Sequence, residues 1–132
     1  LVSLQKSHCV SADNAHAVHP NYVDRHELNN APLINEGVVV KTNVSQRYAT
    51  SPNSLVPIVH AASTAGVNLQ TFSSRNNIAC GSTIGPITAT RIGIETVDIG
   101  VPQLSMHSIR EMCGTKDPVD LVALLSAYFS RS

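Results

Sequence analysis

Carboxylate and imidazole side chains gather in two polar segments of this 132-residue chain. Residues 11–22 read Ser-Ala-Asp-Asn-Ala-His-Ala-Val-His-Pro-Asn-Tyr, with Asp13 followed by two histidines. Residues 103–111 contain one histidine, His107. Carboxylate oxygen and neutral imidazole nitrogen are the usual ligands of a hydrolytic zinc site that keeps positions open for water and substrate. The residue types therefore favour a metal-dependent hydrolase, although the compact His-Glu-x-x-His motif is absent.

Each of these residues also has an ordinary structural interpretation. An aspartate at the end of a strand commonly serves as a turn or helix-cap residue, and a loop histidine more often forms surface hydrogen bonds than binds metal. Lys41 alone is typical of an exposed lysine that protects a sheet edge. The turn at 80–86, Cys-Gly-Ser-Thr-Ile-Gly-Pro, matches neither the P-loop nor the Gly-x-Ser-x-Gly nucleophile pattern. Spacing alone leaves both interpretations open.

Strand and helix patterns alternate along the chain, which predicts an α/β fold with a largely parallel sheet covered by helices. Apolar, β-branched segments predict strands at 8–12, 38–43, 67–73 and 94–99. Helical periodicity predicts helices at 51–65 and 83–92 and a last helix after Asp117-Pro118. The two polar segments each follow a predicted strand, where active sites of open α/β sheets gather.

Local signals are expected to set the helix ends. Ser82 and Asp117 are predicted N-caps, and a glycine follows each of the first two helices as a stop. Pro57 fits its helix only if that helix begins near residue 53 or 54. Residues 14–36 predict one long polar loop. The last helix is predicted to present a broad apolar face, formed by Leu121, Val122, Leu124, Leu125, Tyr128 and Phe129.

Composition limits the possible partners. The chain suffices for one small domain, and its 42% hydrophobic residues suffice for a packed core. A formal net charge of zero argues against nucleic acid and anionic membranes as partners. No apolar segment approaches the roughly 20 residues that span a bilayer. Cys9, Cys80 and Cys113 fit neither a disulfide framework nor a zinc ribbon, so we predict small buried residues in a reducing, cytoplasmic compartment.

Four motifs together resemble those of the aspartyl aminopeptidases, metallopeptidase family M18. They are the segments 11–22 and 80–86, Gln-Arg-Tyr-Ala-Thr at 46–50, and Met-His-Ser-Ile-Arg-Glu at 106–111, in the family's order. The resemblance covers roughly residues 9–112. It implies a zinc-aminopeptidase (phosphorylase/hydrolase-like) catalytic domain that removes an N-terminal Asp or Glu from peptides. It also implies two divalent metal ions, zinc, that activate the attacking water, and assembly into a homo-oligomer, commonly a dodecamer.

The resemblance implies roles for five residues. Asp13 matches a ligand of one metal ion and His107 a ligand of the other. Lys41 matches the specificity residue for the acidic side chain of the substrate, with Tyr48 as a hydrogen-bonding companion. His19 matches a histidine that reaches the active site of a neighbouring subunit, contacts the substrate and stabilises the developing oxyanion.

Other family features are missing from the chain. The bridging aspartate, the adjacent pair of glutamates and the first ligand histidine would belong before Leu1, and the four glutamates of this chain are isolated. We therefore expect residues 1–132 to be the C-terminal part of a single metallopeptidase catalytic domain whose upstream part is missing. This segment alone is expected to be inactive and to need the upstream segment as its partner.

Two readings compete with the enzyme segment. A non-catalytic family remnant could serve as an assembly or scaffold subunit, and Asn30 and Asn77 stand where the family has a histidine and an aspartate. A stand-alone hydrolase with a serine or cysteine nucleophile lacks the base-paired nucleophile pattern that it would need. His16, within the first motif, is explained as well by a structural role as by a functional one.

Overall fold

The structure is a computed structural model that describes residues 2–25, 27, 30–73 and 81–130. The elements, in chain order, are α1 (Val2–Gln5), β1 (His8–Ala12), β2 (Ala15–His16), the 3₁₀ turn η1 (Val23–Arg25), β3 (Val38–Thr42), α2 (Pro52–Ala65), β4 (Leu69–Ser73), α3 (Gly85–Ile92), β5 (Glu95–Gly100), β6 (Pro102–Leu104), β7 (Met112–Cys113) and α4 (Asp117–Phe129). The predicted strands and helices all correspond to elements of this structure, with strand bounds that agree within two residues. The predicted long loop is interrupted by β2 and η1.

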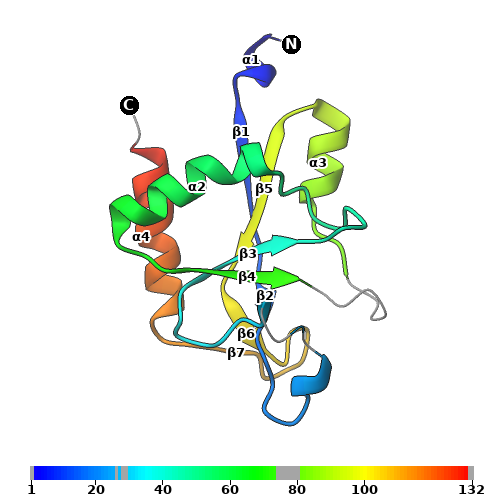
Figure 1. The fold of residues 1–132 in the computed structure, drawn as a ribbon, viewed down its shortest axis with the longest axis vertical. Helices are drawn as coiled ribbons and strands as arrows, with labels where there is room; N and C mark the ends of the chain where they lie inside the picture. Colours follow the sequence, from blue (N-terminus) through cyan, green and yellow to red (C-terminus); the bar gives the residue numbers. More distant parts are fainter. Residues whose placement is uncertain (1, 26, 28–29, 74–80, 131–132) are drawn as a thin grey trace.

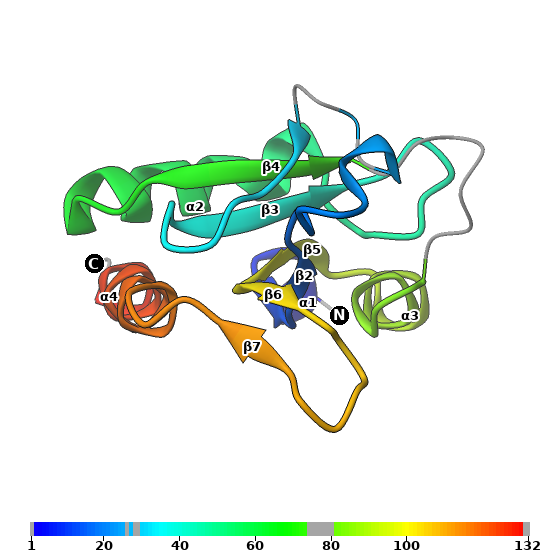
Figure 2. The ribbon, with the colours of Figure 1, turned by 90° about the horizontal axis from the view of Figure 1, so that it is seen from below.

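The main sheet has the strand order β1-β5-β3-β4, and β2-β6-β7 form a second, smaller sheet. Strand β1 pairs in parallel with β5, and β3 pairs in parallel with β4, while β3 and β5 are antiparallel. The fold is therefore α/β with a largely parallel sheet, as predicted. Helices α3 and α4 lie on opposite sides of β5 (Figures 1 and 2). Among the described residues, no helix is long and apolar enough to cross a membrane.

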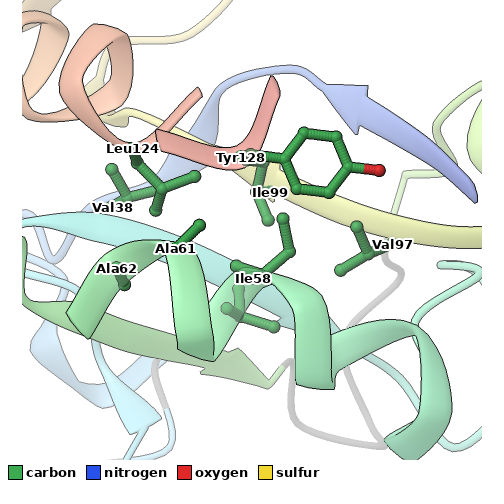
Figure 3. Close-up of a cluster of buried hydrophobic side chains, with 9 residues drawn as sticks. Val38, Ile58, Ala61, Ala62, Val97, Ile99, Leu124 and Tyr128 are labelled. Carbon is green, nitrogen blue, oxygen red and sulfur yellow. The ribbon is translucent and has the colours of Figure 1, made fainter. Parts of the chain in front are cut away.

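One hydrophobic core lies between the sheet and the helices α2 and α4 (Figure 3). Its fully buried members come from alternate positions of β3 and β5 and from both helices, namely Val38, Val40, Ile58, Ala61, Ala62, Val97, Ile99, Leu124 and Tyr128. Val39, between two of these positions, belongs to a second cluster with Ala15, Tyr48 and Phe72. Because successive strand side chains point to opposite faces, the second cluster lies on the face of the sheet away from α2 and α4.

The start of α3 differs from the prediction. The helix begins at Gly85 rather than Thr83, and no side chain caps it. The Ser82 hydroxyl instead donates to the Arg47 carbonyl at 3.2 Å, and the Thr83 hydroxyl donates to Asp98 at 2.7 Å. The predicted Ser82 cap is therefore wrong, because the Ser82 hydroxyl binds a carbonyl group from a distant part of the chain.

Helix α2 begins before residue 53, which is earlier than the position of Pro57 was expected to allow. Ser51 is the N-cap, and its side chain and that of Ser54 form a reciprocal capping box, so the helix begins at Pro52. Pro57 thus lies beyond the first turn, where its missing N–H leaves the Asn53 carbonyl without the usual helical donor. The capping box sets the start of α2 at Pro52 although Pro57 then lies inside the helix.

Helix α4 has Lys116 as its N-cap and Asp117 as its first residue, so the predicted Asp117 cap is wrong. The buried Asp117 carboxylate accepts the backbone N–H of Asn35 at 2.8 Å and that of Gly37 at 3.4 Å. Asp117 therefore fastens the start of α4 to the loop that enters β3, because this loop offers donors that compete with the helix's own.

One burial prediction, that of the cysteines, is also wrong, and α4 buries only part of its apolar face. In α4, Leu124 and Tyr128 are buried, but Val122 is 65% exposed and Phe129 is 76% exposed. The contact of α4 with α2 and β3 covers only part of the predicted apolar face. Cys9 is half-buried and Cys113 is exposed, both as free thiols, whereas Cys80 lies outside the described residues.

Replacement of Asp117 by alanine is expected to lower the free energy of unfolding by about 1–3 kcal/mol, because the N–H groups of Asn35 and Gly37 lose their acceptor. Urea unfolding followed by circular dichroism measures this change. The matched control is Asp120→Ala in the same helix, where only the ion pair with the exposed Lys116 is lost and at most about 1 kcal/mol is expected. Equal effects of the two substitutions would contradict the role of Asp117.

Candidate metal and substrate site

Asp13 lies at the carboxyl end of β1, where the chain continues along β5. Its backbone N–H donates to the Ile99 carbonyl at 3.0 Å, and the N–H of Ala15 donates to the Val101 carbonyl at 2.9 Å. A Cβ atom at Gly100 would overlap the Asp13 carbonyl oxygen. Only glycine therefore allows this close approach, which places the Asp13 carboxylate at the edge of the sheet.

Lys41 lies beside Asp13 and is buried. Its Nζ is 3.8 Å from Oδ2 of Asp13, and the side chains of Lys41 and Asp13 are 2% and 60% exposed. The same ammonium donates to the Asn14 carbonyl at 3.2 Å. Strand β3 lies between β5 and β4, so the interpretation of Lys41 as an exposed edge lysine is wrong. A buried ammonium needs carboxylate or carbonyl oxygen close to it. The Asp13 carboxylate and the Asn14 carbonyl provide this oxygen.

Tyr48 and Phe72 form the wall next to this ammonium. The Lys41 Nζ lies 5.5 Å from the centroid of the Tyr48 ring, within the range of a cation–π contact. The Tyr48 and Phe72 rings pack edge to face, with centroids 6.2 Å apart. Both residues are buried, so Lys41 is held in an aromatic surrounding that disfavours water.

His16 lies on β2, close to the same charges. Its ring is 6.3 Å from that of Phe72. Partial burial lowers the pKa of His16, the positive charges of His107 and Lys41 lower it further, and Asp13 opposes them. Because the unfolded chain then binds more protons, the contribution of His16 to stability is largest above about pH 6.5 and declines as the pH falls. Its surroundings therefore favour the neutral form of the His16 ring.

His107 lies in a tightly hydrogen-bonded loop between β6 and β7. Its φ is 67° and that of Ser105 is 56°, values that non-glycine residues rarely adopt. The N–H of His107 donates to Glu111 Oε1 at 2.6 Å, and the N–H of Ser108 donates to the Ser105 carbonyl at 3.0 Å. Backbone conformations of this kind persist where the surroundings hold them, often at functional sites. Glu111 is thus the residue that holds His107 in place.

Truncation of this carboxylate tests the role. On the expectation that His107 is a metal ligand, Glu111→Ala in the full-length protein that carries this chain should weaken zinc binding about 10-fold, the lower end of the effect of losing a residue that orients a ligand. Zinc titration with a competing chelator measures it. The matched control is Ile109→Ala, since Ile109 in the same loop is fully exposed. Unchanged zinc affinity in Glu111→Ala would contradict the assignment.

His19 is separate from the residues around Lys41. Its Nδ1 accepts the N–H of Asn21 at 3.1 Å, and its ring lies 5.2 Å from that of Tyr22. In the part of the chain that the structure describes, the hydrogen bonds and ring contacts of His19 stay within its own loop. Tyr22 is 51% exposed, so the loop carrying His19 lies at the surface.

The described residues contain no group of three or more His, Cys, Asp or Glu side chains that could hold a metal ion. Asp13 and His107 have the right donor types and are both exposed. The N–H of Asn14 donates to Asp13 Oδ1 at 2.7 Å, and Oδ2 lies 3.8 Å from Nζ of Lys41. Their chemistry fits metal coordination, with each residue as one ligand of a site that needs further ligands.

The sequence prediction missed Asp98 and Gly100, which support this site from β5. Asp98 is fully buried and binds the loop after Tyr48. The available signal was the Val-Asp-Ile-Gly segment itself, because a carboxylate and a glycine inside an apolar strand are both unusual.

The sequence matches a known protein family over nearly its whole length. The family model described as Aminopeptidase I zinc metalloprotease (M18) matches residues 1–129. The chain belongs to the M18 family. A relative in the family, the probable M18 family aminopeptidase 2 of Pseudomonas paraeruginosa (strain DSM 24068 / PA7), is 49% identical over 130 residues, which cover 98% of this chain and 30% of the relative. The chain thus spans about 30% of the length of the curated M18 relative.

Solved structures of M18 proteins share the fold. A chain of the Ape4 and Nbr1 complex superposes with a TM-score of 0.95 at 50% identity, over 97% of this chain and 24% of that chain. The S. cerevisiae mApe1 dodecamer gives a TM-score of 0.85 at 30% identity, over 97% of this chain and 28% of that chain. The resemblance inferred from the four motifs is therefore confirmed at the level of the M18 family.

Proposed function

We propose that this chain supplies part of the active site of a metal-dependent aminopeptidase that removes N-terminal Asp or Glu from peptides. The observation that carries the proposal is the buried Lys41 ammonium beside the exposed Asp13 carboxylate. A metal-dependent hydrolase needs a carboxylate as a metal ligand. Recognition of an acidic substrate side chain needs a cation close to the reacting centre. Membership of a zinc metalloprotease family supports the first half of this pairing.

Two zinc ions are the proposed cofactors, with Asp13 as a ligand of one and His107 as a ligand of the other. When bound, zinc polarises the scissile carbonyl and lowers the pKa of the attacking water. The loop contacts of His107 orient it before binding, and the Asn14 N–H orients Asp13. Ligands held in this way need little reorganisation when the metal enters.

Lys41 and Tyr48 are the proposed pocket for the acidic side chain of the substrate. A substrate carboxylate would pair with Nζ of Lys41, beside the Asn14 carbonyl and the Tyr48 ring. A neutral side chain would leave the buried ammonium with less compensation, which costs binding free energy. Selectivity for Asp and Glu then follows from one buried charge.

The rest of the site is proposed to come from outside residues 1–132, which form the C-terminal part of the catalytic domain. Strand β1 is an edge strand of the main sheet, and Asp13 follows it directly. An upstream segment adding a strand at this edge would bring the missing ligands and general base next to Asp13. Residues 1–132 alone are then expected to be inactive.

We further propose a homo-oligomer, a dodecamer like the mApe1 relative, in which His19 stabilises the oxyanion in a neighbouring subunit. The surface position of the His19 loop supports this role. His19→Ala is expected to lower kcat about 100-fold, a typical loss for one oxyanion donor, with the oligomer intact by size-exclusion chromatography. The matched control is His60→Ala, an exposed histidine of α2. Full kcat in His19→Ala would remove His19 from the site.

A cytoplasmic location is proposed because Cys9 and Cys113 are free thiols, which favours a reducing compartment. The proposed partner is a peptide with an acidic N-terminal residue. Neither nucleic acid nor a membrane is proposed, since the net charge is zero.

The decisive experiment measures hydrolysis of an aspartyl and a leucyl peptide by the full-length protein that carries this chain. We expect hydrolysis with preference for the aspartyl peptide, loss of activity with chelator, and recovery with zinc. A folded oligomer that is inactive with every divalent metal would instead indicate a non-catalytic scaffold subunit. Chelator-resistant activity blocked by serine or cysteine reagents would exclude the metal site.

A further inference from the structure

Asp98 is a buried carboxylate at the centre of β5 that faces no solvent, with 0% of its surface exposed. Its Oδ2 accepts the backbone N–H of Ala49 at 2.6 Å, and its Oδ1 accepts the Thr83 hydroxyl at 2.7 Å. Hydrogen bonds to an ionised acceptor are shorter and stronger than neutral ones. Asp98 therefore joins two loops that are far apart in the sequence.

The first of these loops carries Tyr48. Ala49 follows Tyr48 directly, and the N–H of Asp98 donates to the Thr50 hydroxyl at 3.0 Å. The loop is thus bound to β5 at Ala49, through the Asp98 carboxylate, and at Thr50, through the Asp98 backbone N–H. Through the two residues that follow Tyr48, these hydrogen bonds hold the backbone of the Tyr48 loop against β5.

The second loop begins α3. A Cβ atom at Gly85 would overlap the Asp98 carboxylate, so the first turn of α3 reaches the carboxylate only because residue 85 is glycine. The partial positive charge at the helix N-terminus favours an anion at this place. The Thr83 hydroxyl and the start of α3 together compensate the buried charge of Asp98.

Asp98 and Lys41 lie on the same face of the sheet. In the antiparallel pair β3–β5, Val40 is opposite Ile99, and both point into the core with α2 and α4. Lys41 follows Val40 and Asp98 precedes Ile99, so both side chains point to the other face. This is the face where Tyr48 packs with Val39 and Phe72.

We propose that Asp98 is a positioning residue for the substrate side-chain pocket, because its hydrogen bonds hold the Tyr48 loop against the Lys41 ammonium. The inference rests on the proposed function of Lys41 and Tyr48. Loss of these hydrogen bonds would let the Tyr48 ring leave its place 5.5 Å from Nζ and let water reach the ammonium. A hydrated ammonium discriminates less between acidic and neutral side chains.

Two variants of the full-length protein test the proposal. Asp98→Asn keeps the size of the side chain and removes its charge, and Thr83→Val removes one donor without touching Asp98. Each is expected to raise KM for an aspartyl peptide about 10-fold, to leave kcat and zinc content near wild type, and to reduce the aspartyl-to-leucyl ratio of kcat/KM. Thr83→Ser keeps the hydroxyl and is expected to restore the wild-type ratio.

The matched control is Thr90→Val, since the Thr90 hydroxyl donates only to its own helix, at 2.8 Å from the Pro86 carbonyl. An unchanged substrate ratio in both test variants, or equal losses for both peptides, would overturn the proposal and leave the proposed function standing. A wild-type protein that prefers no acidic residue would overturn both. Should Asp98→Asn fail to fold, the comparison of Thr83→Val with Thr83→Ser decides the matter.

Discussion

Replacement of Asp13 or His107 by alanine in the full-length protein is expected to reduce bound zinc and to lower kcat/KM at least about 100-fold. Losing even a residue that only orients a metal ligand costs about 10–100-fold in affinity or activity, and these residues are proposed as ligands themselves. Because Asp13 also lies beside the buried Lys41 ammonium, circular dichroism of Asp13→Ala checks that the fold is retained. Metal analysis of the purified protein and initial rates with an aspartyl peptide measure the two effects.

Matched controls separate ligand loss from general damage. Asp120→Ala removes an α4 carboxylate that pairs with the exposed Lys116 ammonium, and His60→Ala removes an exposed imidazole from α2. Both controls should keep zinc and activity. If Asp13→Ala and His107→Ala retain full zinc content and turnover, neither residue is a ligand.

Lys41→Met is expected to abolish the preference for acidic substrates. The substitution keeps an unbranched side chain of similar length in the buried position and removes the ammonium, so the aspartyl peptide should lose about 100-fold in kcat/KM. This loss corresponds to about 2.7 kcal/mol, within the range of a hydrogen bond to a charged group. The leucyl peptide should lose little or gain, because its neutral side chain no longer lies beside a charge with which it cannot pair.

The matched control carries the same substitution at Lys116, an exposed lysine whose side chain is 58% exposed. Lys116→Met should leave both peptides unchanged. A Lys41→Met protein that hydrolyses the two peptides in the wild-type ratio would show that another group selects the substrate. Circular dichroism of both variants establishes that the fold is retained.

Local sequence patterns were sufficient to predict the four strands of the main sheet and the helices α2, α3 and α4. The Val38–Val40 segment forms β3 because three β-branched residues in succession favour extended backbone. Gly66 and Gly93 end their helices in the left-handed conformation, at φ of 66° and 64°, as their predicted role as stops requires. These signals depend only on a residue and its immediate neighbours in the chain, so they can be read from the sequence without knowledge of the fold.

Helix starts that depend on distant partners could not be predicted in this way. Ser82 and Asp117 have the residue types of N-caps, yet each binds a loop elsewhere in the chain: Ser82 contacts Arg47, and Asp117 contacts Asn35. The side chain goes to whichever donor or acceptor the tertiary structure brings near. Local propensity is a weak guide where such partners compete.

By itself, the sequence determined the order of the four main-sheet strands and of the helices α2, α3 and α4, the M18 motifs and the presence of Asp13, His107, Lys41 and Tyr48 as candidate site residues, but not the short strands β2, β6 and β7. Only the tertiary structure decided that Lys41 is buried, because the strand order β5-β3-β4 places its strand inside the sheet. Likewise, only the fold brought Asp98 to the loop of Tyr48. Burial and pairing between distant segments depend on how strands and loops pack in space, and no local spacing of residues records that arrangement.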